Sequence, residues 1–282
     1  MQYNVNEFQI EGTTLVKYLG QDSMCVIPSG ITHIEDRSFW SCENVEKIII
    51  PNGAVSIGEY AFSCCEKLEE IIISNSVVSI GENAFSLSKN LKKIIIPNSV
   101  VDIGRGTFFG CESITDICLP CGLRKVESCT FRGCCNLENV IIPDSVIEIG
   151  GSAFCDCYNL KRINLPDNLI RIEDSAFMSS GLENIIIPDS VKYIGRSAFY
   201  ACGGRPIEVS VPDGVEEIGG SAFFNCMSLR KANLPKTVRK IGREIFGHDP
   251  NGYLQEVYIS SQCPDDVKQQ LYDEYKEKII EI

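Results

Sequence analysis

The sequence has 282 residues, of which 44% are hydrophobic and 23% are charged, a composition typical of a folded protein and not of a disordered one. Its formal net charge of −12 argues against nucleic acid as a partner, because phosphate groups are bound through clustered lysine and arginine. The same charge disfavours anionic membrane surfaces, and no apolar run approaches the length of a transmembrane helix, so we expect no membrane insertion.

The first 26 residues are related only loosely to the rest of the chain, and we predict an N-terminal cap over residues 1–26. The opening segment MQYNVNEFQIEG has neither the basic nor the apolar region of a secretory signal. On the sequence as given we therefore expect a cytoplasmic protein with reduced thiols. Removal of a leader would instead place the protein at the cell surface or outside the cell.

Residues 27–260 consist of ten repeats of about 23 residues. Phenylalanine marks the most regular position of the repeat, and ten of the thirteen phenylalanines occupy it. They are Phe39, Phe62, Phe85, Phe108, Phe131, Phe154, Phe177, Phe199, Phe223 and Phe246. One unit has the pattern LxxIxIPxSVxxIGxxAFxxC, and most of its prolines and glycines keep the same register.

Each part of the unit has a physical role. The alternating apolar residues of LxxIxIP predict a short strand with one buried face, and the proline ends that strand because it lacks an N–H. The segment SVxxIG adds two inward residues, and we expect its glycine to provide a turn with unusual dihedral angles, as at Gly58 and Gly81. A single unit cannot bury its own apolar residues, so the units are predicted to stack around a shared core.

After Pro264, the stretch VKQQLYDEYKEKIIEI places Val267, Leu271, Tyr275 and Ile279 at helical spacing. We predict a C-terminal capping helix within residues 261–282, which would cover the open end of the array. Cap, repeats and cap account for the whole chain, so residues 1–282 are predicted to form a single domain.

The repeat unit resembles the BspA-like leucine-rich repeats of bacteria and protozoa, which have 23-residue units with an IP…V…IG…AF…C signature. The resemblance covers about residues 27–260. It implies a repeat solenoid, β-rich and wound as a right-handed coil, with a parallel sheet on the concave side. Short turns or helical pieces would form the other side. It also implies a role in binding proteins, often in adhesion at the cell surface.

Seven of the fifteen cysteines occupy one position of the repeat. The position three residues after the repeat phenylalanine holds the following residues: Cys42, Cys65, Ser88, Cys111, Cys134, Cys157, Ser180, Cys202, Cys226 and Asp249. Exchange with serine predicts a small, buried and partly polar position, and we interpret these cysteines as an inert ladder. Cys64, Cys135 and Cys155 lie outside the ladder, and Cys118 and Cys121 form a CLPC motif without the context of a redox or zinc site.

The sequence gives no support for catalysis, and no cofactor is predicted. Neither histidine, His33 or His248, belongs to a motif with a serine or cysteine nucleophile. No HExxH, P-loop or GxGxxG pattern is present. A metal site is not expected from the cysteine ladder, because a ladder spreads its ligands along an axis.

In each LxxIxIP segment, the residue two positions before the proline faces outward. These residues form a row across the sheet, and the row is apolar in the first half of the array. We predict that this row and the charged row beside it bind a protein or an extended ligand on the concave sheet face. The residues assigned to partner binding are Ile49, Ile72, Ile95, Cys118, Ile141, Ile186, Lys47, Glu70, Lys93, Asp116 and Tyr258. β-Branched residues also simply suit a sheet surface, so sequence alone leaves this second explanation open.

Irregular loops within 201–211 and 247–259 are a further candidate for recognition, with Tyr253 as an aromatic residue near Tyr258. The sequence thus predicts a non-catalytic protein-binding scaffold, with adhesion as one such role. A structural protein that self-associates through the same apolar row is the alternative.

Overall fold

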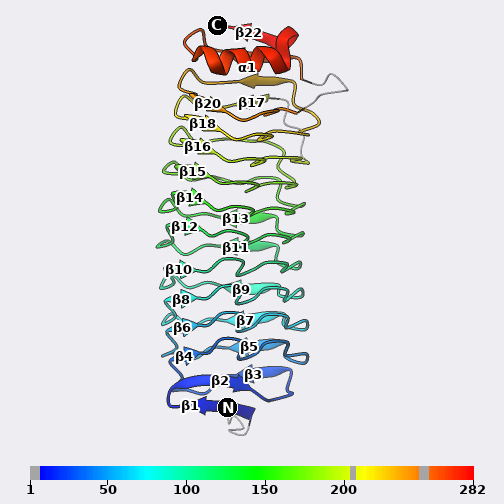
Figure 1. The fold of residues 1–282 in the computed structure, drawn as a ribbon. Coiled ribbons are helices and arrows are strands. Elements are labelled where there is room, and N and C mark those ends of the chain that lie inside the picture. The colour runs from blue at the N-terminus through cyan, green and yellow to red at the C-terminus, as the bar shows by residue number, and fades with distance from the viewer. Residues whose placement is uncertain (1–6, 204–207, 248–253) are drawn as a thin grey trace.

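The structure is a computed structural model that describes residues 7–203, 208–247 and 254–282. Within these ranges the chain winds into a stack of similar coils, with its N-terminus at one end and a helix at the other (Figure 1). Except for a hairpin at the N-terminal end, the strand pairings of the described residues are parallel and join equivalent strands of successive coils. The pairing is interrupted between residues 103 and 116, where β9 (Lys93–Ile95) and β10 (Asp102–Ile103) do not pair with β11 (Asp116–Cys118) and β12 (Lys125–Val126). The predicted repeat solenoid is therefore confirmed.

One face of the stack, which we call the strand face, is formed by the LxxIxIP segments. Its strands are β3 (Met24–Val26), β5 (Lys47–Ile49), β7 (Glu70–Ile72), β9 (Lys93–Ile95), β11 (Asp116–Cys118), β13 (Asn139–Ile141), β17 (Glu208–Ser210), β19 (Lys231–Asn233) and β21 (Glu256–Ile259). They make three sheets, because β9 does not pair with β11 and because the two coils between β13 and β17 contribute no strand to this face. The predicted alternation holds: Ile94 and Ile96 are buried, whereas Ile95 is 81% exposed.

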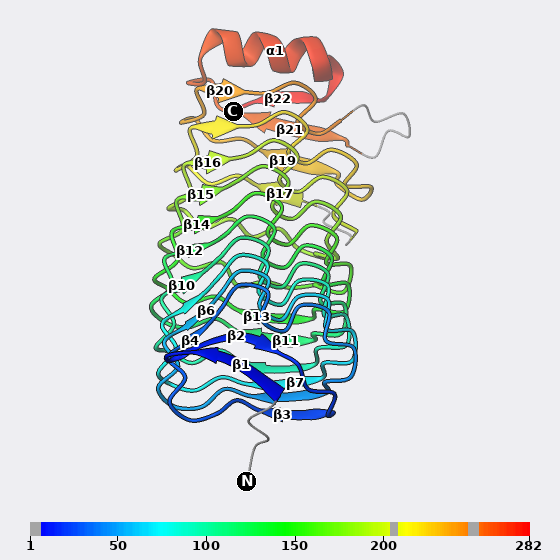
Figure 2. The same cartoon turned by 60° about the horizontal axis from the view of Figure 1, so that its bottom comes forward.

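A second parallel array is formed by the SVxxIG segments. Its strands have two residues each: β4 (His33–Ile34), β6 (Ser56–Ile57), β8 (Ser79–Ile80), β10 (Asp102–Ile103), β12 (Lys125–Val126), β14 (Glu148–Ile149), β15 (Arg171–Ile172), β16 (Tyr193–Ile194), β18 (Glu217–Ile218) and β20 (Lys240–Ile241). The isoleucine or valine of each strand points inward and is buried. Figures 1 and 2 show these strands in register along one side of the stack.

The glycine that follows each of these strands has a role other than the predicted one. Gly58 and Gly81 do not have positive φ, so the expectation of unusual dihedral angles was wrong. A Cβ atom on Gly81 would lie 2.7 Å from the carbonyl carbon of Gly58 in the coil before it. These glycines are required because the backbones of successive coils approach closely.

The left-handed conformation instead occurs on both sides of the repeat phenylalanine, in the turn that forms the third side of each coil. Positive φ occurs two residues before the phenylalanine, as at Asn83 (52°), and two residues after it, as at Leu87 (58°). Most residues at these positions are not glycine, so most coils contain strained backbone in this turn. The turn is held by the next coil, because the N–H of Asn83 donates to the oxygen of Arg105 and that of Leu87 to Phe109.

The repeat phenylalanines form one column through the centre of the stack. From Phe39 to Phe223 each ring is fully buried, and successive centroids from Phe62 to Phe223 are 5.3–5.5 Å apart. Most of these neighbours stack within 12° of parallel. Each coil therefore gains aromatic contacts only from its two neighbours, as expected for a one-dimensional array.

The cysteine ladder lies beside this column, and its side chains form hydrogen bonds to the preceding coil. The Cys111 thiol donates to the carbonyl oxygen of Phe85 in the preceding coil at 3.1 Å, and Ser88 donates in the same way to Phe62 at 2.7 Å. Cys65, Cys134, Cys157, Cys202 and Cys226 repeat this contact. Serine and cysteine exchange here because both are small hydrogen-bond donors. Cys42 is only half-buried in the first coil, and Asp249 lies outside the described residues.

We expect the ladder thiols to resist alkylation in the native protein. Burial raises the pKa of the Cys111, Cys134 and Cys157 thiols, so little of the reactive thiolate forms near neutral pH. Brief treatment with iodoacetamide at pH 8 should modify the exposed Cys118 and Cys121, and peptide mass spectrometry would locate the modified residues. Modification of Cys134 as fast as Cys118 would contradict this prediction, and unfolding in urea should remove the difference.

The remaining cysteines are also free thiols. Cys64 and Cys135 are half-buried, but Cys155, which the sequence placed outside the ladder, is fully buried and donates to Asp156 Oδ2 at 3.3 Å.

At the N-terminal end, β1 (Phe8–Glu11) and β2 (Thr14–Tyr18) form an antiparallel hairpin whose second strand pairs in parallel with β4. The hairpin continues the aromatic column, because the Tyr18 ring stacks on Phe39 with centroids 4.8 Å apart. Phe8 packs against Tyr18 in turn at 5.3 Å.

At the C-terminal end, α1 (Asp265–Tyr275) lies across the last coil (Figure 2). The predicted helix is confirmed and begins directly after Pro264, with Val267, Leu271 and Tyr275 buried. Its predicted extent was too long, because η2 (Lys276–Lys278) ends it and Ile279 lies in β22 (Ile279–Glu281), which pairs in parallel with β21.

Side chains of α1 replace the coil that is missing at this end. In other coils the N–H of the repeat phenylalanine donates to the next coil, as Phe85 does to Thr107. In the last coil the Phe246 N–H donates to the Tyr275 hydroxyl at 3.1 Å, and the Glu244 N–H donates to Glu274 Oε2 at 2.9 Å. The helix therefore satisfies backbone donors that the end of a solenoid would leave unpaired.

Candidate protein-binding face

The strand face aligns the outward residues in the predicted row. The pairing of β3, β5, β7 and β9 places Ile49, Ile72 and Ile95 directly beside one another, and β11 and β13 do the same for Cys118 and Ile141. The row begins one coil earlier than predicted, because Val26 of β3 pairs with Ile49. Sequence analysis missed Val26 because its strand lies in the segment assigned to the cap.

The outward isoleucines are increasingly exposed toward the middle of the array. Ile49 is half-buried and Ile72 is 43% exposed, whereas Ile95 and Ile141 are 81% and 63% exposed. Cys118 between them is also exposed. Ile186 is 76% exposed, but it lies in a coil without a strand and is separated from Ile141 by Asn164. The apolar row therefore extends from Val26 to Ile141 and is divided between two sheets, one from Val26 to Ile95 and one with Cys118 and Ile141.

The row of polar residues beside it pairs across the strands, as predicted. Lys47 and Glu70 form an ion pair at 2.8 Å, and the hydrogen bond from Lys47 lowers the pKa of the Glu70 carboxyl. Asn139 donates to Asp116 Oδ1 at 2.7 Å. Lys93 makes no ion pair or side-chain hydrogen bond within the described part of the chain.

The C-terminal half of the strand face is polar and internally paired. Lys231 and Glu256 form an ion pair at 2.9 Å, and the Tyr258 hydroxyl donates to Glu256 Oε2 at 3.0 Å. The half-buried Tyr258 is thus tied to its own strand and separated from the apolar row by several coils. The structure does not bring Tyr258 together with the isoleucines, and Tyr253 lies outside the described residues.

The described residues contain no arrangement that resembles a catalytic centre at either histidine position. His33 is exposed on the second array, where its Nδ1 lies 2.8 Å from the hydroxyl of Thr32, and His248 is outside the described ranges. No group of three or more His, Cys, Asp or Glu suited to a metal ion occurs in residues 7–203, 208–247 and 254–282. Within the same ranges no helix combines the length and hydropathy that a membrane span needs.

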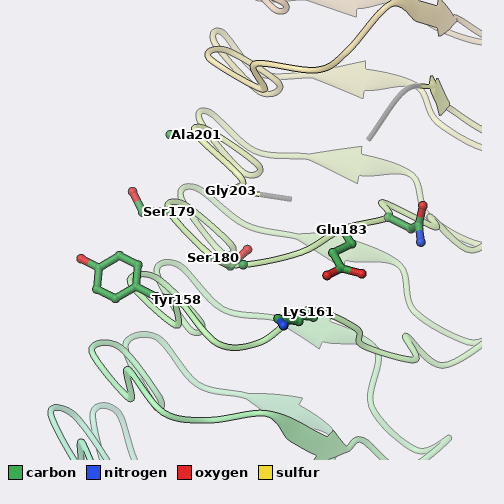
Figure 3. Close-up of a pocket in the computed structure, with 9 residues that line it drawn as sticks. Tyr158, Lys161, Ser179, Ser180, Glu183, Ala201 and Gly203 are labelled. Carbon is green, nitrogen blue, oxygen red and sulfur yellow. The ribbon is translucent and has the colours of Figure 1, made fainter. Parts of the chain in front are cut away.

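Two surface features escaped sequence analysis. A second outward apolar row lies on the array of two-residue strands and contains Val55, Val78 and Val101, which are 41–54% exposed. A pocket of about 670 Å³ opens beside the turn at Ser179 and Ser180 (Figure 3). The sequence feature that accompanies this pocket is the interval from Phe177 to Phe199, which is one residue shorter than the usual 23.

The repeat pattern agrees with comparison to known families. The family model described as BspA type leucine rich repeat region (6 copies) matches residues 21–137 and 124–252. The chain belongs to this family. Leucine-rich repeat proteins of this kind are generally non-catalytic scaffolds, and no curated protein sequence matches the chain.

Solved bacterial leucine-rich repeat proteins are similar to the chain. A leucine rich cell surface protein of Faecalibacterium prausnitzii is 21% identical, with a TM-score of 0.61 over 100% of this chain and 94% of that chain. A protein of Eubacterium ventriosum is 18% identical, with a TM-score of 0.51 over 86% and 75%. One of Bacteroides ovatus is 26% identical, with a TM-score of 0.44 over 95% and 87%. The first two show that this leucine-rich repeat fold is shared.

Proposed function

We propose that this leucine-rich repeat protein is a non-catalytic scaffold that binds a protein or an extended ligand through the strand face, with adhesion as one such role. The observation that carries the proposal is the apolar row from Val26 to Ile141, in which Ile95 is 81% exposed. The similarity to a bacterial cell-surface leucine-rich repeat protein is consistent with this role.

Ile95 offers an apolar side chain that a partner can cover. It pairs with Ile72 on one side only, because β9 is the edge strand of its sheet, and most of its side chain is exposed. Exposed apolar surface that continues a row of neighbouring apolar residues commonly marks a binding site. Burial of an exposed isoleucine in an interface contributes about 1.5–3 kcal/mol, so a row of them is a substantial source of affinity.

The charges of the row beside it suit this role. Lys47 and Glu70 neutralise each other, which lowers the cost of removing water from this part of the face. Lys93 forms no ion pair or side-chain hydrogen bond among the described residues, although its charge helps to lower the pKa of the Glu70 carboxyl. It lies on the same strand as Ile95, where it is available to a partner carboxylate. The apolar row would provide affinity, and Lys93 would orient the partner.

The proposal predicts that Ile95→Lys weakens partner binding at least about tenfold without unfolding the protein, because it places a charge at the centre of the apolar row. Immobilised protein would be incubated with extracts, and retained proteins would be quantified by mass spectrometry. Val101→Lys is the matched control, because Val101 is 54% exposed but lies on the second array. Circular dichroism would confirm that both variants are folded.

Proteins retained by the wild type and by Val101→Lys, but lost from Ile95→Lys, would support the strand face as the binding surface. If the wild type and both variants retained the same proteins, the strand face would not be the binding surface. Light scattering tests the alternative: a concentration-dependent oligomer of the wild type that Ile95→Lys disrupts would indicate self-association through the same row.

A further inference from the structure

The pocket near Ser180 arises from the one coil with a shortened corner. In the preceding coil two residues, Tyr158 and Asn159, separate the ladder residue from the next core leucine, whereas Gly181 alone separates Ser180 from Leu182. A Cβ atom on Gly181 would collide with the carbonyl oxygen of Tyr158, so the shortened corner is drawn in against its neighbour. The missing residue leaves the pocket of about 670 Å³, and that volume is typical of small-molecule sites.

An aromatic ring and hydroxyl groups line one side of this pocket. Tyr158 is 56% exposed, and its hydroxyl donates to Asp156 Oδ1 at 3.3 Å, which restrains the ring but leaves it accessible. Figure 3 shows Tyr158 and Ser179 at the outer edge, with Lys161 and Glu183 on the other side of Ser180. The position of Tyr158 holds Glu66, Lys89 and Glu112 in earlier coils, so an aromatic residue distinguishes this one.

The charged residues of the pocket form no ion pair with each other, unlike Glu69 and Lys92 at the same position. Lys161 and Glu183 occupy the same position of successive coils, and the Glu183 N–H donates to the Lys161 oxygen at 3.0 Å. At this position earlier along the stack, Lys92 and Glu69 form an ion pair at 3.1 Å. Neither Lys161 nor Glu183 forms an ion pair or a side-chain hydrogen bond within the described ranges. Their hydrogen-bonding capacity is therefore available to a ligand.

A second hollow of about 470 Å³ adjoins the pocket and shares Lys161 and Glu183 with it. Arg162 and Glu138 add one charge of each sign, and Asn139 and Asn159 add amides that both donate and accept. The two hollows thus share part of their lining, and each is lined by equal numbers of positive and negative side chains. A ligand with net charge would meet a like charge in either hollow, whereas a neutral ligand would not.

We propose that this pocket, named here the notch site, binds a neutral saccharide. Sugar hydroxyl groups donate and accept hydrogen bonds, which matches a lining of ammonium, carboxylate, amide and hydroxyl groups. The apolar C–H face of a pyranose ring packs on an exposed aromatic ring such as Tyr158. The notch site is separate from the apolar row of the strand face, so this inference does not depend on the proposed protein-binding function.

Saturation-transfer NMR with glucose, galactose, N-acetylglucosamine, maltose and lactose tests the proposal on the full chain. We expect transfer to at least one of these sugars. Tyr158→Ala should weaken that binding about tenfold, because it removes the stacking ring. Met227→Ala is the matched control, since Met227 is 66% exposed at the same position of a later coil and should leave binding unchanged.

A second variant tests the origin of the site. Insertion of one asparagine between Ser180 and Gly181 restores the usual corner, should fill the notch and should abolish binding while circular dichroism remains native. Absence of transfer to every sugar of the panel overturns the proposal, as does unaltered binding in Tyr158→Ala. Preferential transfer to free glutamate or lysine would overturn it in favour of a charged ligand. Ile95→Lys should bind sugar normally, which keeps this test independent of the strand face.

Discussion

Phe131→Ala is expected to destabilise the protein by about 3–5 kcal/mol, the cost of a large cavity in a closely packed core. Phe131 is fully buried and stacks between Phe108 at 5.4 Å and Phe154 at 5.3 Å. Because each coil contacts only its neighbours, the cavity also weakens the coupling between the two halves of the array. Urea unfolding followed by circular dichroism should show a lower midpoint and a transition that broadens or splits into two steps.

Phe109→Ala is the control for this experiment. Phe109 is the same residue type in the same coil as Phe108, but it lies outside the column and is half-buried. Its replacement should cost clearly less and keep a single transition. Equal losses from the two variants would show that the aromatic column has no special part in stability.

Removal of residues 265–282 is expected to have the second large effect. Val267, Leu271 and Tyr275 of α1 are buried, and each contributes about 1.5–3 kcal/mol by its transfer from water. The deletion also exposes Phe246 and frees one edge of β21, which pairs with β22 in the intact chain. An uncovered strand edge is a template for pairing with another chain. We therefore expect lower thermal stability together with concentration-dependent association, measured by calorimetry and light scattering.

Two point variants separate the hydrogen bonds made by α1 from its apolar packing. Tyr275→Phe keeps the ring but leaves the Phe246 N–H without its acceptor, so a loss of about 1–3 kcal/mol is expected. Glu277→Ala, at an exposed position of η2, should have little effect. A monomeric deletion variant as stable as the full chain would contradict the role assigned to α1.

The columns of the fold could be predicted because a one-dimensional array places each repeat position in the same environment in every coil. Ten phenylalanines at one position therefore lead directly to one column, and exchange between Cys111 and Ser88 indicates a buried donor. The alternation in IIIP fixes which isoleucine faces outward. The outward row follows from that alternation, but the alternation does not determine the exposed fraction of each side chain.

Other features depend on geometry that residue types do not specify. Residues such as Asn83 and Leu87 adopt left-handed conformations because the next coil accepts their N–H groups, and no glycine marks them. Ile279 fits both a helical and a strand pattern, and pairing with β21 decides between them. The short interval before Phe199 is visible in the sequence, but only the three-dimensional structure contains the pocket beside Ser180.

The turns around the phenylalanine column have a mechanical consequence. The termini lie at opposite ends of the stack (Figure 1), so a force applied between them acts along its axis. A coil at the end is held by one neighbour and an internal coil by two, so extension would begin at an end and proceed one coil at a time. Each released coil of 23 residues would lengthen the molecule by roughly 75 Å, and its strained turn would relax as it left the stack. Under tension the protein would thus behave as an extensible tether that yields in equal steps.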